Sequence, residues 1–173
     1  MKNYRQLLSN IKIMIFDYDG VLNDGRVLLI KDDEPVRTIH VKDGYALQHA
    51  IKQGLEIIII SGGRSENVRT RLERIGIKHI YLGVQNKLTL FQELQQKLNF
   101  NLNEILYMGD DIPDYPVMKE VALPVCPADA AEEIKNISQY ISSKKGGEGC
   151  VRDIIEQVLK VQNKWMNENA FIW

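Results

Sequence analysis

The segment Phe16-Asp17-Tyr18-Asp19-Gly20-Val21-Leu22-Asn23-Asp24-Gly25 decides the fold, because it leads from an apolar run into an acidic glycine turn. The apolar run, residues 11–16, predicts a strand that is covered on both faces of a sheet. Open α/β sheets bind ligands beyond the carboxyl ends of such strands. Asp17 and Asp19 lie two positions apart before a glycine, so both carboxylates can face one small site. An ordinary acidic turn does not need the whole string, so a functional site is favoured.

The rest of the chain alternates short apolar runs with segments of helical period. This alternation predicts an α/β fold, a parallel sheet with helices on both faces. Residues 27–30 and 36–41 flank Lys-Asp-Asp-Glu-Pro and predict a β-hairpin inserted directly after the first strand. Repeats and linkers are lacking, so residues 1–173 are expected to form a single domain. Further strands are predicted at 55–60 and 105–108, with weaker ones at 79–82 and 122–125, and helices at 44–53, 65–75, 87–98, 129–136 and 150–161.

The composition is that of a globular protein, with 173 residues, 45% of them hydrophobic and 26% charged. Lys and Arg number 22 against 23 Asp and Glu, which argues against nucleic acid or a membrane surface as a partner. The N-terminal segment is polar, and no apolar run approaches the length of a membrane span. Cys126 and Cys150 fit neither a disulfide framework nor a zinc site, so we expect a reduced, cytoplasmic location.

A second acidic segment, Gly109-Asp110-Asp111-Ile112-Pro113-Asp114, follows the predicted strand at 105–108. Adjacent aspartates repel each other unless a cation or hydrogen bonds offset their charge. Together with Asp17 and Asp19, Asp110 and Asp111 place four carboxylates at one sheet edge. A site with oxygen ligands alone favours Mg²⁺ as the cofactor. Asp111 or Asp114 can also cap the short helix that follows, which is compatible with metal chemistry.

Two weaker elements lie between the acidic segments. Ser61-Gly62-Gly63 joins a strand to a helix, where a hydroxyl group and free backbone N–H groups can bind an anion. Small residues are common in such turns, so this signal alone is weak. Lys87 lies at the start of another predicted helix, and on its own it is typical of a surface lysine.

Taken in order, Asp-x-Asp, Ser, Lys and Gly-Asp-Asp resemble the four motifs of the haloacid dehalogenase superfamily of phosphotransferases, whose fold is Rossmann-like. The resemblance implies that Asp17 is a nucleophile that becomes an aspartyl phosphate. It implies that Asp19 protonates the departing oxygen and then activates water. Ser61 and Lys87 would hold the oxygens of the transferring phosphoryl group. Because dehalogenases lack the second acid, Asp19 favours phosphate transfer.

The same resemblance implies how the metal is held. Mg²⁺ would bind the Asp17 carboxylate, the backbone carbonyl of Asp19 and the carboxylate of Asp110. Asp111 and Asp114 would support the ion from behind these ligands or through water.

Most relatives in this superfamily cover the site with a cap domain, and this chain has no room for one. Asp19 and Ser61 are 42 positions apart, and Lys87 and Asp110 are 23 apart. Both stretches are occupied by predicted elements, whereas an inserted domain needs about 50 residues of its own. Neighbouring subunits can supply the cover instead. The hairpin at 26–41 and the apolar tail at 162–173 are the candidate contacts, although the tail can equally pack within its own chain or fray.

A narrower resemblance covers nearly the whole chain. Besides its capless shape, the chain contains the motifs Gly-Val-Leu-Asn-Asp-Gly, Val41-Lys42-Asp43-Gly44, Gly109 to Asp114, Cys126-Pro127-Ala128-Asp129-Ala130 and Lys145-Gly146-Gly147-Glu148-Gly149. Together these features look like those of 3-deoxy-D-manno-octulosonate 8-phosphate phosphatases. That family hydrolyses an eight-carbon keto-sugar acid phosphate on the route to lipopolysaccharide, and it forms homotetramers through its hairpins. The phosphatases of nine-carbon keto-sugar acid 9-phosphates share nearly all of these motifs, and a non-catalytic assembly module related to cytidylyltransferase-fused domains is a third alternative.

A sugar-acid phosphate carries a carboxylate besides its phosphate, so a cationic contact is expected. Arg64, Arg71 and Arg74 lie largely on one face of the predicted helix at 65–75, and with Gly62 they are the candidate substrate-binding residues. A solvated basic face explains each arginine equally well. The octulosonate enzymes often have an arginine directly after Ser-Gly, where this chain has Gly63, so the choice between eight and nine carbons stays open.

Overall fold

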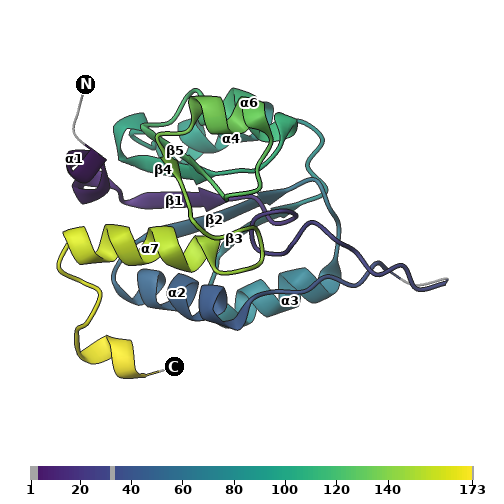
Figure 1. Ribbon diagram of the computed structural model, residues 1–173, viewed down its shortest axis with the longest axis horizontal. Helices are drawn as coiled ribbons and strands as arrows, with labels where there is room; N and C mark the ends of the chain where they lie inside the picture. Colours follow the sequence, from purple (N-terminus) through teal and green to yellow (C-terminus); the bar gives the residue numbers. More distant parts are fainter. Residues whose placement is uncertain (1–3, 32–33, 173) are drawn as a thin grey trace.

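The computed structural model describes residues 4–31 and 34–172, and its centre is one parallel sheet (Figure 1). The strand order is β3-β2-β1-β4-β5-β6, and every neighbouring pair is parallel. The chain therefore winds outward from β1 in one direction and then returns to continue from β1 in the other. The strands are β1 (Ile13–Phe16), β2 (Glu56–Ser61), β3 (His79–Leu82), β4 (Ile105–Met108), β5 (Leu123–Cys126) and β6 (Tyr140–Ile141).

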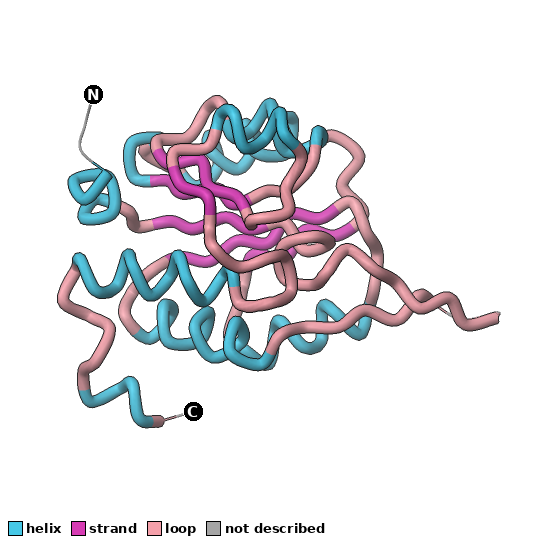
Figure 2. Tube along the Cα trace, viewed as in Figure 1, coloured by secondary structure: helices cyan, strands magenta, loops and turns pink. Residues whose placement is uncertain are grey.

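Helices cover both faces of this sheet, as Figures 1 and 2 show. Alternate residues of β1 divide the core into two clusters. Met14 and Phe16 pack with α1, α2, α3 and α7, whereas Ile13 and Ile15 pack with α4, α5 and α6. The prediction of a doubly covered parallel sheet is confirmed. The helices are α1 (Tyr4–Asn10), α2 (Val41–Lys52), α3 (Glu66–Ile75), α4 (Lys87–Leu98), α5 (Tyr115–Met118), α6 (Glu132–Ile137) and α7 (Cys150–Val161), with short 3-10 turns η1 (Leu102–Glu104), η2 (Ile112–Asp114) and η3 (Glu168–Phe171).

Local sequence explains where the helices near the carboxyl edge begin and end. The Ser65 hydroxyl accepts a hydrogen bond from the N–H of Val68, and Gly76 ends α3 with a φ of 101°. The Asn86 side chain caps α4 in the same way, accepting from Thr89. The caps fix the start of α4 at Lys87, which places this lysine at the edge where β1, β2 and β4 end.

The predicted hairpin differs from the observed structure. The described residues 26–31 and 34–40, called the strap below, form a single antiparallel bridge between Leu28 and Val36, closed by two hydrogen bonds of 3.0 Å. The strap projects from the carboxyl edge and ends where α2 begins (Figure 2). The apolar side chains of residues 27–30 and of Val36 are exposed, Leu29 to 76%, whereas Ile39 packs against the core. Strands of such a hairpin need a packed face, and within the described chain the strap packs little of its apolar surface.

Two other features were not predicted from the sequence. The first is the helix α1, which lies in the polar N-terminal segment. The second is the two-residue strand β6 at the edge of the sheet. Both are short, so their local patterns are weak. Among the described helices, none has both the length and the apolar composition that crossing a bilayer requires.

The tail packs against α2 of its own chain. The hydroxyl of Tyr45 donates a hydrogen bond of 2.5 Å to the carbonyl of Ala170, and Lys52 Nζ donates one of 2.8 Å to that of Ile172. In Figure 1 the tail lies at the end of the sheet opposite the carboxyl edge. In the single chain the tail therefore packs intramolecularly, which is one of the alternatives that the sequence left open.

Candidate active site

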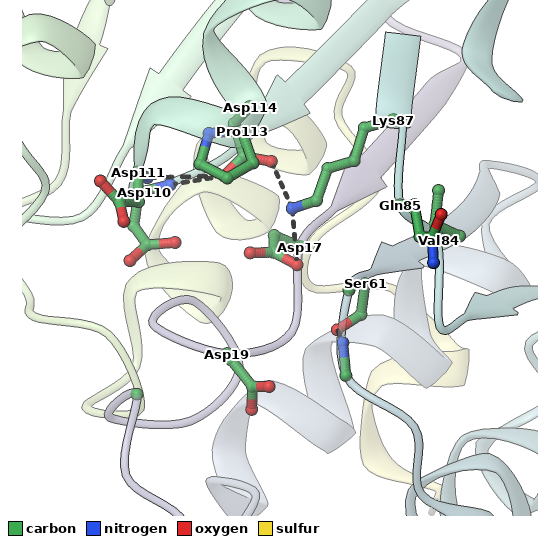
Figure 3. Close-up of a pocket in the computed structure, with 13 residues that line it drawn as sticks. Asp17, Asp19, Ser61, Val84, Gln85, Lys87, Asp110, Asp111, Pro113 and Asp114 are labelled. Atoms are coloured by element: carbon green, nitrogen blue, oxygen red, sulfur yellow. Dashed lines mark hydrogen bonds and ion pairs between the residues drawn. The ribbon is translucent and has the colours of Figure 1, made fainter. Parts of the chain in front are cut away.

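A cavity of about 390 Å³ opens at the carboxyl edge of the sheet, where β1, β2 and β4 end (Figure 3). The register aligns Phe16 with Ile59 and Met108, so the three strands finish at nearly the same level. The turns after these strands consequently meet around one volume, as the topology of an open parallel sheet requires. The cavity is lined by Asp17, Asp19, Gly25, Ser61, Gly62, Gly63, Val84, Gln85, Lys87, Asp110, Asp111, Pro113 and Asp114.

Lys87 joins two of the carboxylates inside the cavity. Its Nζ lies 3.0 Å from Oδ1 of Asp17 and 2.7 Å from Oδ1 of Asp114. All three side chains are buried. Burial alone would lower the pKa of Lys87, but the charges of Asp17 and Asp114 outweigh it and raise the pKa. The lysine is therefore a fixed positive charge beside Asp17, where it can hold an anionic ligand.

The carboxylates of Asp17, Asp110 and Asp114 repel one another. One oxygen from each residue lies within 4.8 Å of the others, which is close enough to share a metal ion. Burial, followed by repulsion from Asp114, raises the pKa of Asp17 to about 7. Burial, followed by repulsion from Asp17, raises the pKa of Asp110 to about 8. A divalent cation is the group that would relieve this repulsion, because Lys87 alone leaves the acidic cluster with excess negative charge.

Asp110 and Asp114 differ in how their oxygens are used. Oδ1 of Asp110 is buried and has no hydrogen-bond partner among the described residues, which leaves it available to a cation. Asp114 Oδ1 accepts from Lys87 and, at 2.6 Å, from the hydroxyl of Tyr107, while its Oδ2 accepts from the N–H of Asp110 at 3.2 Å. Asp114 is close enough to bind a metal, but its oxygens are already occupied. We therefore assign the direct contact to Asp17 and Asp110, and a supporting role to Asp114.

Glycines allow the two acidic turns to approach each other. Gly20 has a φ of +87°, and a Cβ at this position would lie 2.0 Å from Oδ2 of Asp110. Only glycine combines this backbone conformation with such a close contact. Gly20 thus sets the distance between the turn that carries Asp17 and the turn that carries Asp110.

Asp19 is held by residues outside the acidic cluster. Asn23 Nδ2 donates to its Oδ1 at 2.8 Å, and Arg37 Nε donates to Oδ1 at 2.9 Å and to Oδ2 at 3.1 Å. The Asn23 Oδ1 accepts from the N–H groups of Gly20 and Gly25, which closes the turn. Figure 3 shows the Asp19 carboxylate directed away from Asp17.

The turn after β2 supplies the other wall. Ser61 is the last residue of β2, and its side chain is buried, with Oγ accepting a hydrogen bond of 3.2 Å from the N–H of Gly63. Gly62, which the sequence indicates as a candidate substrate-binding residue, also lines the cavity. A hydroxyl group at this wall, facing Lys87 across the cavity, suits the oxygens of a phosphoryl group.

The three predicted arginines do not line the cavity of the single chain. The Arg64 side chain lies against Gly83, and Arg74 is exposed on α3. Arg71 approaches Gly44 on α2, with its Nη2 at 3.5 Å from the position that a Cβ would take. Asp111 is exposed, directly precedes η2 as its N-cap and lines the cavity.

Arg37 and Asn23, the two side chains that hold Asp19, were not predicted as site residues. Asn23 lies within the Gly-Val-Leu-Asn-Asp-Gly motif, and asparagine is common in turns, so the sequence did indicate its place in the turn. Arg37 lies in the strap, and nothing local indicates that this segment returns to Asp19. Together the residues place a buried carboxylate beside a lysine, three carboxylates close enough to share a metal ion, and a separate carboxyl group at Asp19. Phosphoryl transfer through an acyl phosphate can use such a set.

Comparisons with known proteins agree with this chemistry. The sequence family described as haloacid dehalogenase-like hydrolase matches residues 80–154. The 3-deoxy-D-manno-octulosonate 8-phosphate phosphatase KdsC of Escherichia coli (strain K12) is 37% identical over 156 residues, which are 90% of this chain and 83% of that protein. The crystal structure of the Moraxella catarrhalis phosphatase, in complex with magnesium ion, phosphate ion and KDO molecule, has a TM-score of 0.89 and 35% identity over 97% of this chain and 95% of that chain. The cobalt-bound phosphatase from Haemophilus influenzae has a TM-score of 0.90 and 30% identity over 97% of this chain and 100% of that chain.

Proposed function

The chain belongs to the haloacid dehalogenase-like hydrolases, in the family of the 3-deoxy-D-manno-octulosonate 8-phosphate phosphatases, and on this premise we propose that it hydrolyses that phosphate ester to the free sugar acid and phosphate. This reaction would serve the synthesis of lipopolysaccharide precursors. The observation that carries the proposal is the buried Asp17 carboxylate, paired with Lys87 at 3.0 Å at the floor of a cavity that also holds Asp110 and Ser61.

In the first step, an oxygen of the Asp17 carboxylate attacks phosphorus and the bond from phosphorus to the sugar oxygen breaks. Lys87 and Ser61 hold the phosphoryl oxygens during this transfer, where fixed donors contribute most. Asp19 gives its proton to the departing oxygen, so the sugar acid leaves as a neutral alcohol at that position. The product on the protein is an aspartyl phosphate at Asp17.

In the second step, Asp19 accepts a proton from water, and the resulting hydroxide attacks the phosphorus of the aspartyl phosphate. The bond from phosphorus to the Asp17 oxygen breaks, which restores the carboxylate and releases phosphate. The same residue thus acts first as an acid and then as a base.

The cofactor is Mg²⁺. The residues that would hold it are Asp17 and Asp110, through carboxylate oxygens, and Asp19, through its backbone carbonyl, with Asp111 and Asp114 behind them. When bound, the ion neutralises charge on the carboxylates and on the phosphoryl oxygens. The unpartnered Oδ1 of Asp110 fits this role.

The substrate's carboxylate needs a cationic partner. Arg71 is the candidate we retain among the three predicted arginines, because its positive charge lies near Tyr18, the neighbour of Asp17, and opposes the rise that burial causes in the pKa of the Tyr18 hydroxyl. A nine-carbon keto-sugar acid 9-phosphate remains the second candidate substrate, since Gly63 departs from the arginine that octulosonate enzymes often carry. A non-catalytic assembly role is disfavoured, because Asp17, Lys87 and Asp110 are arranged for chemistry.

We also propose a homotetramer joined through the straps. Val27, Leu28, Leu29 and Ile30 are consecutive, Val36 pairs with Leu28 across the bridge, and these five residues are 40–76% exposed. A contiguous apolar patch of this kind marks an interaction surface. A neighbouring subunit on the strap would narrow the open cavity, which the single chain leaves without a cap.

The cytoplasmic location and the extent of the single domain stay predictions of the sequence. The location can be checked by cell fractionation, and the domain by limited proteolysis.

The function is tested by phosphate release from a set of sugar phosphates, with Mg²⁺ and with EDTA. We expect the eight-carbon sugar-acid phosphate to have the highest kcat/KM and EDTA to abolish turnover. A higher kcat/KM on the nine-carbon keto-sugar acid 9-phosphate would identify that compound as the substrate instead. No turnover on any phosphate would favour the assembly role.

A further inference from the structure

The strap reaches the active site through one side chain. Arg37 extends from the strap to Asp19, and its Nε contacts both carboxylate oxygens, at 2.9 and 3.1 Å. Only 10% of the Arg37 side chain is exposed, so its guanidinium is largely shielded from solvent. Nη1 of Arg37 also lies 3.4 Å from the carbonyls of Pro35 and Arg64, which orients the guanidinium from two sides.

Gly63 provides the space that this guanidinium occupies. A Cβ at position 63 would lie 2.7 Å from Nη2 of Arg37 and 2.7 Å from Oδ2 of Asp19. Gly63 has a backbone conformation that other residues adopt, so the space and not the backbone requires a glycine here. Any side chain at this position would enter the contact between Arg37 and Asp19.

The strap is fixed to the body of the protein on the other side of Arg37. Glu34 accepts a hydrogen bond of 2.9 Å from the Ser65 hydroxyl and hydrogen bonds from the N–H groups of Glu66 and Asn67, at 3.0 and 3.2 Å. These contacts hold the strap at the start of α3. They place Arg37 in a fixed position relative to the turn after β2.

We propose that Arg37 is a positioning residue for Asp19, and that Gly63 is the position that makes room for it. The proposal rests on the proposed function, because it assigns a role in proton transfer to the departing oxygen. Asp19 is 30% exposed at the edge of the cavity, and in the described chain its other partner is Asn23. Without Arg37 the carboxylate would sample orientations in which it cannot meet the departing oxygen. The strap is thereby a part of the catalytic apparatus as well as a surface.

Leaving groups separate this role from a general structural one. An alkyl oxygen departs slowly unless it receives a proton, whereas p-nitrophenolate departs readily without one. The ratio kcat/KM covers the steps up to transfer of the phosphoryl group to Asp17, so it reports the protonation step. Misplacing Asp19 should therefore lower kcat/KM for an alkyl phosphate and leave it nearly unchanged for p-nitrophenyl phosphate.

The experiment measures kcat/KM on a sugar-acid phosphate and on p-nitrophenyl phosphate for Arg37→Gln, Arg37→Lys and Gly63→Ala. We expect Arg37→Gln to lose about 10- to 100-fold on the sugar-acid phosphate, in the range for misplaced acid–base groups. Arg37→Lys should recover part of this loss, because an ammonium group can contact one Asp19 oxygen. Gly63→Ala should resemble Arg37→Gln, and the double variant should lose no more than either single variant.

Arg26→Gln is the matched control, because Arg26 carries the same charge on the same strap and is 89% exposed beside Asp24. Arg26→Gln should leave kcat/KM unchanged on both substrates, and thermal unfolding should show that each variant is folded. Equal losses on both substrates would assign Arg37 a purely structural role, and additive losses in the double variant would remove Gly63 from the proposal. If the wild-type protein hydrolyses neither substrate, the proposed function fails, which is a separate result from an unchanged ratio in active variants.

Discussion

Lys87 donates a hydrogen bond of 2.7 Å to Asp114, and the pair is buried at the floor of the cavity. Lys87 opens α4 and Asp114 ends η2, so the contact ties the two sides of the active site together. The same lysine stands 3.0 Å from Asp17. One ammonium group thus both supports the fold at this edge and sets the charge beside the nucleophile.

The first prediction concerns this lysine. Lys87→Met should abolish phosphate release and lower the free energy of unfolding by about 3–5 kcal/mol, because it leaves Asp17 and Asp114 buried without their cation. Urea unfolding in EDTA measures the change in stability. Lys97, in the last turn of the same helix, provides a control as Lys97→Met, which should stay within about 0.5 kcal/mol of the wild type. A Lys87→Met variant as stable as the wild type would contradict the structural half of this prediction.

The second prediction concerns the nucleophile. Asp17→Asn should abolish turnover while the fold stays intact, because it removes the attacking oxygen and also relieves repulsion among three carboxylates. We therefore expect the thermal midpoint in EDTA to match or exceed that of the wild type, and Mg²⁺ to raise it less. Calorimetric titration with Mg²⁺ provides the binding measurement. Undiminished Mg²⁺-dependent turnover in this variant would remove the mechanism.

The third prediction is a pH dependence of stability. Asp17 and Asp110 have folded-state pKa values raised to about 7 and about 8, above the value near 4 of an unfolded aspartate. The folded protein then binds more protons than the unfolded chain between about pH 4 and pH 8, so its stability falls as the pH rises through this window. Urea midpoints in EDTA should show this fall.

Mg²⁺ should reduce that fall, because it stabilises the charged carboxylates. Asp110→Asn should reduce it as well in EDTA, since it removes one of the two titrating groups. A stability in EDTA that rises steadily from pH 5 to pH 8 would show that these carboxylates are not crowded in solution.

The fourth prediction separates strain from contact at a glycine. Gly20 and Gly54 have nearly the same φ, +87° and +85°, but a Cβ at Gly20 would strike Asp110 whereas one at Gly54 would meet nothing within 4 Å. Gly54→Ala should therefore cost only the backbone strain, about 1–2 kcal/mol. Gly20→Ala should cost more and should also weaken Mg²⁺ binding, because Asp110 must move. Equal losses of stability and unchanged Mg²⁺ affinity would mean that the two turns are not in close contact.

The fifth prediction concerns assembly. Leu29→Glu should turn the proposed homotetramer into smaller species in light scattering, because it places a charge in the middle of the exposed strap patch. The Leu29 side chain is 76% exposed in the single chain, so the free energy of unfolding of the monomer should hardly change. Val41→Glu, at a 67% exposed position beyond the strap, is the control. A wild-type protein that is fully active as a monomer would overturn the tetramer.

Much of the fold was predictable because its patterns are local. The runs that became β1, β2 and β4 are continuous and apolar, and Ser65 and Gly76 mark the ends of α3 by their own chemistry. The strap was harder, because residues 27–30 have the pattern of a strand but pack little within the chain. Strand pairing in such a segment depends on the surface against which its apolar side chains pack, and the sequence of one chain does not show that surface.

The sequence by itself determined the parallel sheet and the carboxylates, serine and lysine at its carboxyl edge, because apolar runs and turn residues act over a few neighbouring positions. Only the tertiary structure decided how these residues divide their tasks. Asp110 keeps an oxygen free, and Asp114 gives its oxygens to Lys87, Tyr107 and a backbone N–H. Arg37 reaches Asp19, whereas the three arginines predicted to bind the substrate do not line the cavity. Such assignments depend on distances between segments far apart in the chain, and these distances are set by packing and not by spacing in the sequence.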